Sequence, residues 1–188
     1  ASRLAVTLTS YPPRFAQLEL TLRSLLDQTI RADRTMLWVA EEDWDKLPAG
    51  IHALCAHGLE IRRTTDLKSY KKLIPAIRED ANYYYVTADD DVYYPPDWLE
   101  GLVEIAADHP QQVIAYRAHI AHVGEDGALA PYSKWGLATH RLIVDEPAAR
   151  LFPTGVGGIL YPPAAFAEEV LDEAQFLELA PRGDDIWF

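Results

Sequence analysis

Cysteine is almost absent from this sequence of 188 residues, in which Cys55 is the single thiol. One cysteine excludes a disulfide within the chain and is typical of a reducing compartment, so we expect a cytoplasmic protein. Long apolar runs are missing too, since none approaches the roughly 20 residues that span a bilayer. We identify no signal peptide before the first apolar segment. The sequence therefore predicts no membrane span.

Basic residues are scarce as well. The chain has 17 lysines and arginines against 29 aspartates and glutamates, and its formal net charge is −12. Such a charge disfavours binding to the phosphate backbone of a nucleic acid. No GxGxxG motif follows the first apolar segment, which argues against a dinucleotide-binding fold. The composition that remains, 49% hydrophobic and 24% charged, is typical of a folded domain with a sizeable core.

The most informative stretch is an aromatic run that ends in three carboxylates. Tyr83–Thr87 is rich in strand formers, and Asp89, Asp90 and Asp91 follow after one alanine. Adjacent carboxylates repel one another unless a cation lies among them, and Mg²⁺ or Mn²⁺ prefers such oxygen ligands. The stretch therefore predicts a metal site for a phosphate-bearing ligand. The alternative is a solvated acidic turn whose Asp97 caps the following helix.

Apolar periodicity predicts strands that alternate with helices through the first half of the chain. We expect strands at residues 4–8, 35–40, 59–61 and 83–87. Helices are expected at residues 14–27, at 71–81 and after Pro95 and Pro96. The buried face of the last helix should comprise Trp98, Leu99, Leu102, Val103 and Ile105. This alternation is typical of parallel βαβ units.

The second half is less regular, with a strand or hairpin arm expected at residues 113–123 and a loop at 124–136. We find no internal repeat and no linker. We therefore predict one domain over residues 1–188, with a nucleotide-binding half (1–98) and an acceptor and catalytic half (99–188). Its aromatic ending without a polar tail suggests that the chain is cut short of its natural C-terminus.

Four stretches, taken in order, resemble the GT-A glycosyltransferases, and most closely their bacterial family-2-like group. They are VTLTSYPPR (6–14), DLKSYKKL (66–73), TADDDV (87–92) and GDDIW (183–187). The resemblance implies the GT-A fold, a three-layer α/β domain with a mostly parallel central sheet and an irregular C-terminal half. It also implies a metal-dependent enzyme that moves a sugar from a nucleotide-diphosphate donor, most often a UDP-sugar, to a glycan or another hydroxyl acceptor.

The resemblance assigns roles to the acidic triplet. Asp91 would bind Mn²⁺ or Mg²⁺ directly. Asp89 would share the metal through water or face the ribose, and Asp90 would touch the donor sugar. A cation at this point would stabilise the diphosphate that leaves when the sugar–phosphate bond breaks.

The same resemblance places the nucleotide between two loops. Thr9, Tyr11 and Arg14 would hold the base, ribose and phosphates, although Arg14 has an equal alternative as a solvated first-turn residue. Asp66 would accept a hydrogen bond from the base ring, or would form a turn. Lys72 would contact a phosphate, or would lie on an exposed helix face.

Asp184 and Asp185 resemble the acidic pair that supplies the general base of inverting enzymes. Asp185 is our first choice for the base that deprotonates the acceptor hydroxyl in a single displacement, and Asp184 the second. The pair could instead cap the last helix. The glycines at 155, 157 and 158 indicate either a close approach of backbone to ligand or a tight turn.

Two other functions stay open at this point. A nucleotide-sugar binding protein without turnover would share the fold and the acidic triplet. A nucleotidyltransferase would share the architecture, but normally carries a glycine-rich, basic signature after the first strand, where this chain has residues 9–14.

Overall fold

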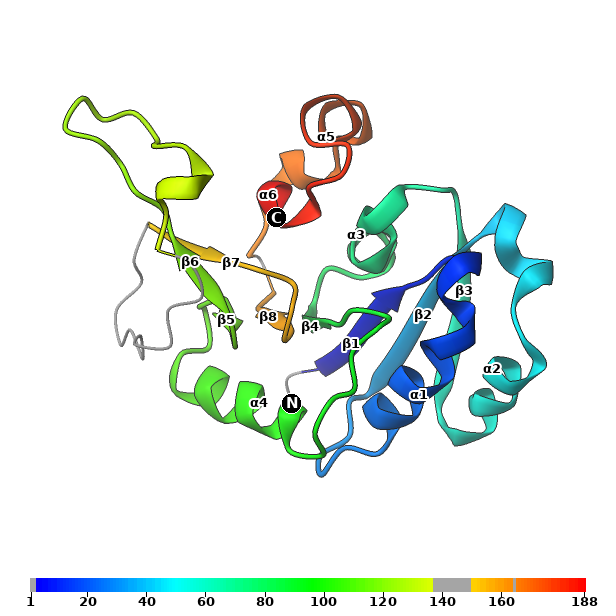
Figure 1. Cartoon of the computed structure of the whole chain (residues 1–188). Coiled ribbons are helices and arrows are strands. Elements are labelled where there is room, and N and C mark those ends of the chain that lie inside the picture. Colours follow the sequence, from blue (N-terminus) through cyan, green and yellow to red (C-terminus); the bar gives the residue numbers. More distant parts are fainter. Residues whose placement is uncertain (1–2, 137–149, 164) are drawn as a thin grey trace.

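A six-stranded, mostly parallel sheet forms the centre of the protein (Figure 1). The computed structural model describes residues 3–136, 150–163 and 165–188. In the sheet, the strands follow the order β3-β2-β1-β4-β8-β5. Their bounds are β1 (Arg3–Thr9), β2 (Arg34–Ala40), β3 (Leu59–Thr64), β4 (Tyr83–Thr87), β5 (Ile114–Ala115) and β8 (Ile159–Tyr161). The first four strands are parallel, and β8 runs antiparallel between β4 and β5.

Helices cover both faces of this sheet. The α-helices are α1 (Phe15–Leu26), α2 (Ala49–Ala53), α3 (Ile74–Glu79), α4 (Trp98–Asp108), α5 (Glu173–Leu179) and α6 (Asp184–Trp187). Short 3₁₀ helices are η1 (Pro12–Arg14), η2 (Glu41–Lys46), η3 (Leu54–His57), η4 (Lys68–Lys72), η5 (Tyr132–Lys134) and η6 (Glu168–Leu171). One apolar cluster joins the sheet to α1, η3 and α4, and another joins it to α3 and the C-terminal segment. The predicted three-layer α/β architecture is therefore confirmed.

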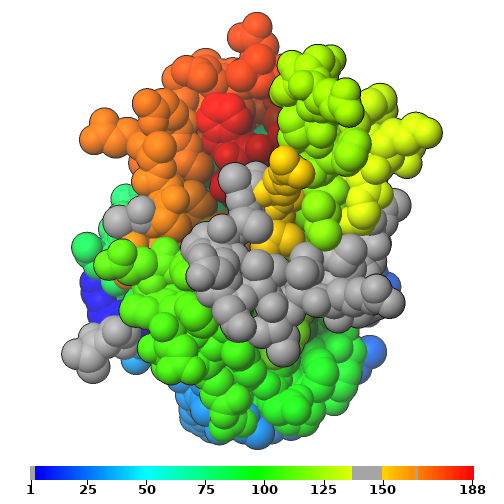
Figure 2. Space-filling view, turned by 90° about the vertical axis from the view of Figure 1, so that its left-hand side faces the viewer, coloured from blue at the N-terminus to red at the C-terminus, as the bar shows by residue number. Residues whose placement is uncertain are grey.

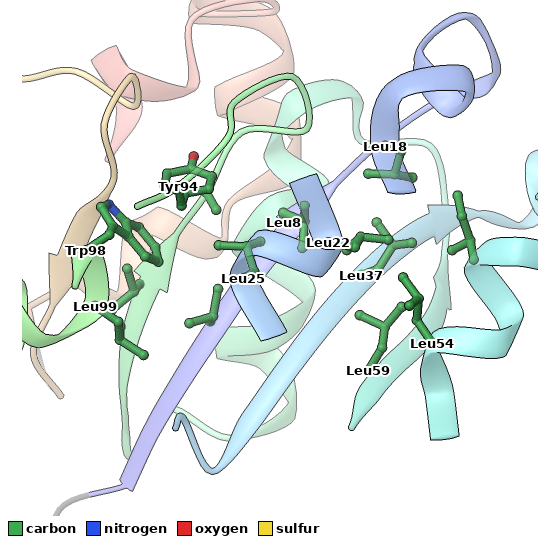
Figure 3. Packing of buried hydrophobic residues seen from close by; sticks show 14 of the residues in the cluster. Leu8, Leu18, Leu22, Leu25, Leu37, Leu54, Leu59, Tyr94, Trp98 and Leu99 are labelled. Atoms are coloured by element: carbon green, nitrogen blue, oxygen red, sulfur yellow. The ribbon is translucent and has the colours of Figure 1, made fainter. Parts of the chain in front are cut away.

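The core follows from the alternation of side chains along each strand. On β1, Val6 and Leu8 face the cluster that contains α1, whereas Ala5 faces the one that contains α3. Figure 3 shows Leu22 of α1 beside Leu8 and Leu37 of the two neighbouring strands, and all three are fully buried. Because the parallel strands are buried on both faces of the sheet, their sequences are nearly continuous apolar runs.

The strands predicted at 4–8, 35–40, 59–61 and 83–87 are confirmed as β1 to β4, and the helix predicted at 14–27 is α1. The helix predicted at 71–81 is wrong in its extent, because a 3₁₀ turn over Lys68–Lys72 precedes the short α3. Pro75, which has no amide hydrogen to donate, lies in the first turn of α3 and favours a helix that begins there.

Two further expectations for the second half need correction. Ile105 of α4 is half exposed and Ala106 is buried in its place, because Ile105 lies at the edge of the apolar stripe that Leu99 and Leu102 define. Residues 113–123 do not form one strand. They contribute β5 to the central sheet and β6 (Ala118–Ile120) to a separate pair with β7 (Leu151–Pro153).

The irregular second half gathers on one side of the molecule. Figure 2 shows the C-terminal segments, orange to red, and the segment around η5, yellow-green, above the green segments that include α4. Tyr70 of η4 stacks on Phe176 of α5, with 4.2 Å between ring centroids, and its hydroxyl donates to the carbonyl of Ala180 at 2.6 Å. These contacts fix the C-terminal segment against η4. Within the described residues, no helix is both long and apolar enough to cross a bilayer.

Tyr85 joins β4 to α3 through a buried hydroxyl, and its removal should destabilise the fold. The hydroxyl lies 2.8 Å from the carbonyl of Ala76 and 2.6 Å from that of Asp80, and burial raises the pKa of Tyr85 to about 12. Tyr85→Phe should lower the free energy of unfolding by about 1–2 kcal/mol, because two acceptors lose their donor. Tyr84→Phe is the matched control, since its hydroxyl bond to Pro110 is exposed. Urea denaturation measures both, and equal losses would contradict this account.

Candidate functional site

A cleft of about 640 Å³ opens where β1 and β4 end. It is lined by all ten residues to which the resemblance assigned a binding or catalytic role: Thr9, Tyr11, Arg14, Asp66, Lys72, Asp89, Asp90, Asp91, Asp184 and Asp185. Of the three glycines considered for contact with a ligand, Gly155 lines it, whereas Gly157 and Gly158 do not. Its other lining residues are Ser10, Asp43, Lys68, Ser69, Lys71, Ala88, Gly155 and Val156. A larger hollow of about 810 Å³ runs along α1 and contains none of the singled-out residues. Ligand sites of open α/β sheets lie at the carboxyl ends of the strands, as this cleft does.

The acidic loop after β4 is fixed to α1 by hydroxyl groups that sequence reasoning missed. Thr21 donates to the carbonyl of Asp90 at 3.1 Å, and Ser24 accepts the amide hydrogen of Tyr94 at 3.1 Å. The buried Tyr94 hydroxyl in turn accepts the amide hydrogen of Asp89 at 2.8 Å. Thr21 and Ser24 are buried polar residues in an otherwise apolar helix face, which is the signal that could have drawn attention to them.

The three acids of the triplet lie in different surroundings. Asp90 is only 8% exposed, and its carboxylate accepts hydrogen bonds from Ser10 at 2.6 Å and from Arg14 at 3.0 Å. Burial raises the pKa of Asp90, while these two partners oppose the rise. The Asp91 side chain is 40% exposed and pairs with Arg14. The Asp90 carboxylate thus serves protein contacts, and the Asp91 carboxylate is the more accessible of the two.

Lys72 joins the triplet to the acidic pair near the C-terminus. Its ammonium lies 2.7 Å from Asp184 and 3.3 Å from Asp89, and the residue is 8% exposed. Burial alone would lower the pKa of Lys72, but the carboxylates of Asp184 and Asp89 outweigh burial and raise it. The backbone carbonyl of Lys72 accepts a hydrogen bond from Thr7 of β1 at 2.5 Å. This burial excludes the alternative of an exposed helix face.

Asp185 is oriented by the backbone of Gly155, whose amide hydrogen it accepts at 3.0 Å. A Cβ at Gly155 would lie 3.0 Å from Asp185 Oδ1, 3.2 Å from Lys72 Nζ and 3.6 Å from Asp89 Oδ1. Three charged side chains therefore converge where this residue has no side chain. Burial raises the pKa of Asp185, with Asp184 and Asp89 acting in the same direction and Gly155 and Lys72 against it. A carboxylate with a raised pKa is a better proton acceptor near neutral pH.

The cleft lining also carries Asp66 with two lysines. Its carboxylate binds Lys71 at 2.5 Å and also Lys68, whose amide hydrogen it accepts at 3.1 Å. Burial opposes ionisation of Asp66, but these bonds outweigh burial and lower its pKa. Asp66 thus forms the turn that the sequence offered as an alternative, and it lines the cleft as well. Among the other lining residues, Thr9 donates to the carbonyl of Trp38 at 2.8 Å, and Tyr11 is 47% exposed.

The alternative that these acidic residues cap helices is not supported by the cap geometry. Gly183 occupies the N-cap position of α6, so Asp184 and Asp185 are its first two helical residues and not its cap. Asp97 does stand at the N-cap of α4, but its side chain makes no capping hydrogen bond. Capping therefore accounts for neither acidic stretch.

The charge of the cleft bears on whether it suits a metal ion. Seven aspartates and four basic side chains line it, which leaves a formal excess of three negative charges. A diphosphate would be repelled by such a lining unless a cation joined it. Among the described residues, no group of three or more His, Cys, Asp and Glu side chains is arranged to hold a metal by itself. One or two carboxylates completed by substrate phosphates is, however, the usual way in which proteins hold Mg²⁺, and Asp91 and Asp89 fit that donor set.

Comparison with known proteins gives information about the fold alone. No protein-family model and no curated protein matches the sequence. The solved structure of residues 1–349 of S. aureus TarS resembles this chain with a TM-score of 0.57 at 15% identity, over 98% of this chain and 53% of that one. The fold that the two chains share is GT-A-like. The chain spans about half the length of that TarS fragment.

Other solved structures share the GT-A-like architecture. The TarS fragment in complex with UDP has a TM-score of 0.58 at 15% identity, again over 98% of this chain and 53% of that one. A 4-diphosphocytidyl-2C-methyl-D-erythritol synthase has a TM-score of 0.52 at 14% identity, over 94% of this chain and 83% of that one. The predicted fold class is thereby confirmed, and the reaction is left to the chemistry of the cleft.

Proposed function

We propose that the protein is a metal-dependent glycosyltransferase that moves a sugar from a nucleotide-diphosphate donor to a hydroxyl acceptor. The donor that we propose is a UDP-sugar. The observation that carries this proposal is the convergence of two acidic groups, the triplet after β4 and Asp184–Asp185, in one cleft. The first group suits a diphosphate with its cation, and the second suits a proton acceptor. TarS, which shares the fold, has been solved in complex with UDP.

In this proposal the residues of the cleft divide into a donor side and an acceptor side. Thr9, Tyr11 and Asp66 bind the nucleoside, and Asp91, with Asp89, holds the divalent cation. Such a cation, when bound, neutralises the charge that develops on the departing diphosphate. Because Lys72 already contacts Asp89 and Asp184, its ammonium adds fixed positive charge between the two sides.

On the acceptor side, Asp185 is the proposed general base. Its carboxylate has one oxygen held by the Gly155 amide, and its pKa is raised by burial. It would take the proton of the acceptor hydroxyl as that oxygen attacks the anomeric carbon from the face opposite the diphosphate. This single displacement inverts the configuration of the sugar. Asp184 is less suited to the role, because it is 8% exposed and paired with Lys72.

Calorimetry tests the proposal directly. UDP titrated into the protein should bind in the presence of Mn²⁺ and should lose at least about tenfold in affinity when EDTA replaces the metal, because the cleft is acidic. CDP, ADP and GDP, titrated in parallel, report which base is bound. A panel of UDP-sugars is then assayed for release of UDP. Metal-independent binding, or no binding of any nucleotide, would contradict the proposal, and binding without turnover would favour a nucleotide-sugar binding protein.

A nucleotidyltransferase is the second candidate, since a 4-diphosphocytidyl-2C-methyl-D-erythritol synthase shares the fold. That reaction would place a nucleoside triphosphate, with a further phosphate, in a cleft that has an excess of acidic groups. Pyrophosphate released from UTP or CTP in the presence of a sugar phosphate would favour this candidate over sugar transfer.

A further inference from the structure

One arginine contacts two acids of the triplet at once. Arg14 follows the Pro12-Pro13 pair at the entry to α1, and its Nη1 lies 3.0 Å from Asp90 Oδ1 while it also donates to Asp91 Oδ2. Its side chain is 37% exposed and lines the cleft. A single guanidinium nitrogen therefore bridges the buried acid and the accessible one.

The two ends of this bridge differ in how firmly they are held. Asp90 is fixed on three sides, because Ser10 donates to its carboxylate at 2.6 Å, Thr21 donates to its carbonyl at 3.1 Å and the side chain is buried. Asp91 has no comparable support among the contacts within the described residues, and 40% of its side chain faces solvent. An approaching cation can therefore compete for the Asp91 carboxylate, while Asp90 keeps its hold on the arginine.

We propose that Arg14 is an exchangeable counterion of Asp91. Before a divalent cation binds, the guanidinium neutralises Asp91. When the cation arrives with a diphosphate, Arg14 gives up Asp91, stays attached to Asp90 and pairs with the diphosphate oxygens. This inference rests on the proposed function and deepens it, because it names the residue that couples the metal to the donor phosphates.

Electrostatics gives the reason for the exchange. A guanidinium is always charged, so it cannot release Asp91 by losing a proton. It also repels a second cation at the same carboxylate oxygen. Planar bidentate pairing with phosphate is the interaction that arginine forms best, so a diphosphate compensates for the contact that is lost. The arginine should therefore oppose the binding of a metal alone and favour the binding of a metal with a diphosphate.

Arg14→Gln tests the exchange because the two effects have opposite signs. Without nucleotide, the affinity for Mn²⁺, measured by the EPR signal of the free ion, should rise roughly threefold, since Asp91 loses a competing partner. At saturating Mn²⁺, the affinity for UDP, measured by calorimetry, should fall at least about tenfold, since one charged contact with phosphate is lost. A residue with only a structural role would weaken both or neither.

Two further variants keep the test sharp. Arg23→Gln removes an exposed arginine of the same helix that pairs with Glu19 outside the cleft, and both affinities should stay as in the wild type. Arg14→Lys keeps the charge but not the planar fork, so UDP binding should fall less than in Arg14→Gln; it also serves if the glutamine variant fails to fold.

The outcomes separate the two proposals. If the wild type binds Mn²⁺ and UDP together but Arg14→Gln weakens Mn²⁺ binding, or changes neither affinity, the counterion exchange is overturned and the proposed function stands. If the wild type binds neither ligand, both are overturned.

Discussion

Asp185→Asn should lower the rate of sugar transfer roughly a thousandfold while the affinity for UDP changes less than about threefold. An asparagine has nearly the same shape as aspartate, and its carbonyl oxygen can still accept the Gly155 amide hydrogen that now orients Asp185. The amide cannot take up a proton near neutral pH, so only the proton transfer is lost. The rate is measured as the release of UDP from whichever UDP-sugar serves as donor for the wild type. The affinity is measured by calorimetry with UDP.

Asp172→Asn is the matched control for this substitution. Asp172 caps α5, where its side chain accepts the amide hydrogen of Gln175, and it lies outside the cleft. Asparagine caps helices about as well as aspartate, so neither rate nor affinity should change. Transfer by Asp185→Asn within tenfold of the wild-type rate would contradict the assignment of the base and would direct attention to Asp184.

Asp91→Ala should abolish the part of UDP binding that depends on Mn²⁺, a loss of about a hundredfold in affinity. A cation stabilises diphosphate charge by several kcal/mol. Each 1.4 kcal/mol corresponds to a tenfold change in affinity, so a hundredfold loss corresponds to about 2.8 kcal/mol. The Asp91 side chain is 40% exposed, against 10% for Asp90 and 23% for Asp89, so its carboxylate is the one that a cation in the cleft reaches most easily. Calorimetry with UDP, with and without Mn²⁺, measures the difference.

Asp97→Ala controls for the removal of one negative charge from the same loop, because the Asp97 side chain makes no capping hydrogen bond and does not line the cleft. UDP binding should keep its full response to Mn²⁺ in that variant. A response to Mn²⁺ that survives in Asp91→Ala would contradict the role of Asp91 as a metal ligand.

The regular first half of the fold follows from the sequence because its signals are local. The spacing of apolar residues is visible within a few residues of each strand and of the leucine-rich helix. The ends of β1, β2, β4 and α1 therefore agree with the sequence-based prediction to within about two residues. The acidic residues that follow β4 could also be placed from the sequence. They come directly after a parallel strand, and the carboxyl ends of such strands lie at the edge of the sheet where ligands bind.

The parts that the sequence did not predict depend on contacts between distant segments. β8 has three residues and completes the sheet by pairing with β4, more than 70 residues earlier in the chain. The glycine turn before it is fixed by Trp98, whose indole donates to the carbonyl of Gly157 at 2.6 Å. A Cβ at Gly158 would lie 2.5 Å from that ring, and φ is +95° there. Only the folded arrangement shows why these glycines are needed.

The partners of the acidic residues were equally out of reach. That Arg14 would pair with Asp90 and Asp91, and Lys72 with Asp89 and Asp184, depends on how loops from four parts of the chain meet. Residue types and order indicated the members of the cleft. Which acids are neutralised, and which are accessible, is decided by burial and distance.

The bare backbone at Gly155 limits how the cleft can change by mutation. Even one methyl group there would press against the Asp185 carboxylate and the Lys72 ammonium, so a substitution of Gly155 would disturb the charged groups of the cleft. Val156, the next residue, is half exposed on the lining and makes no such demands. A change in the ligands that the cleft accepts would therefore arise more readily at Val156 than at Gly155.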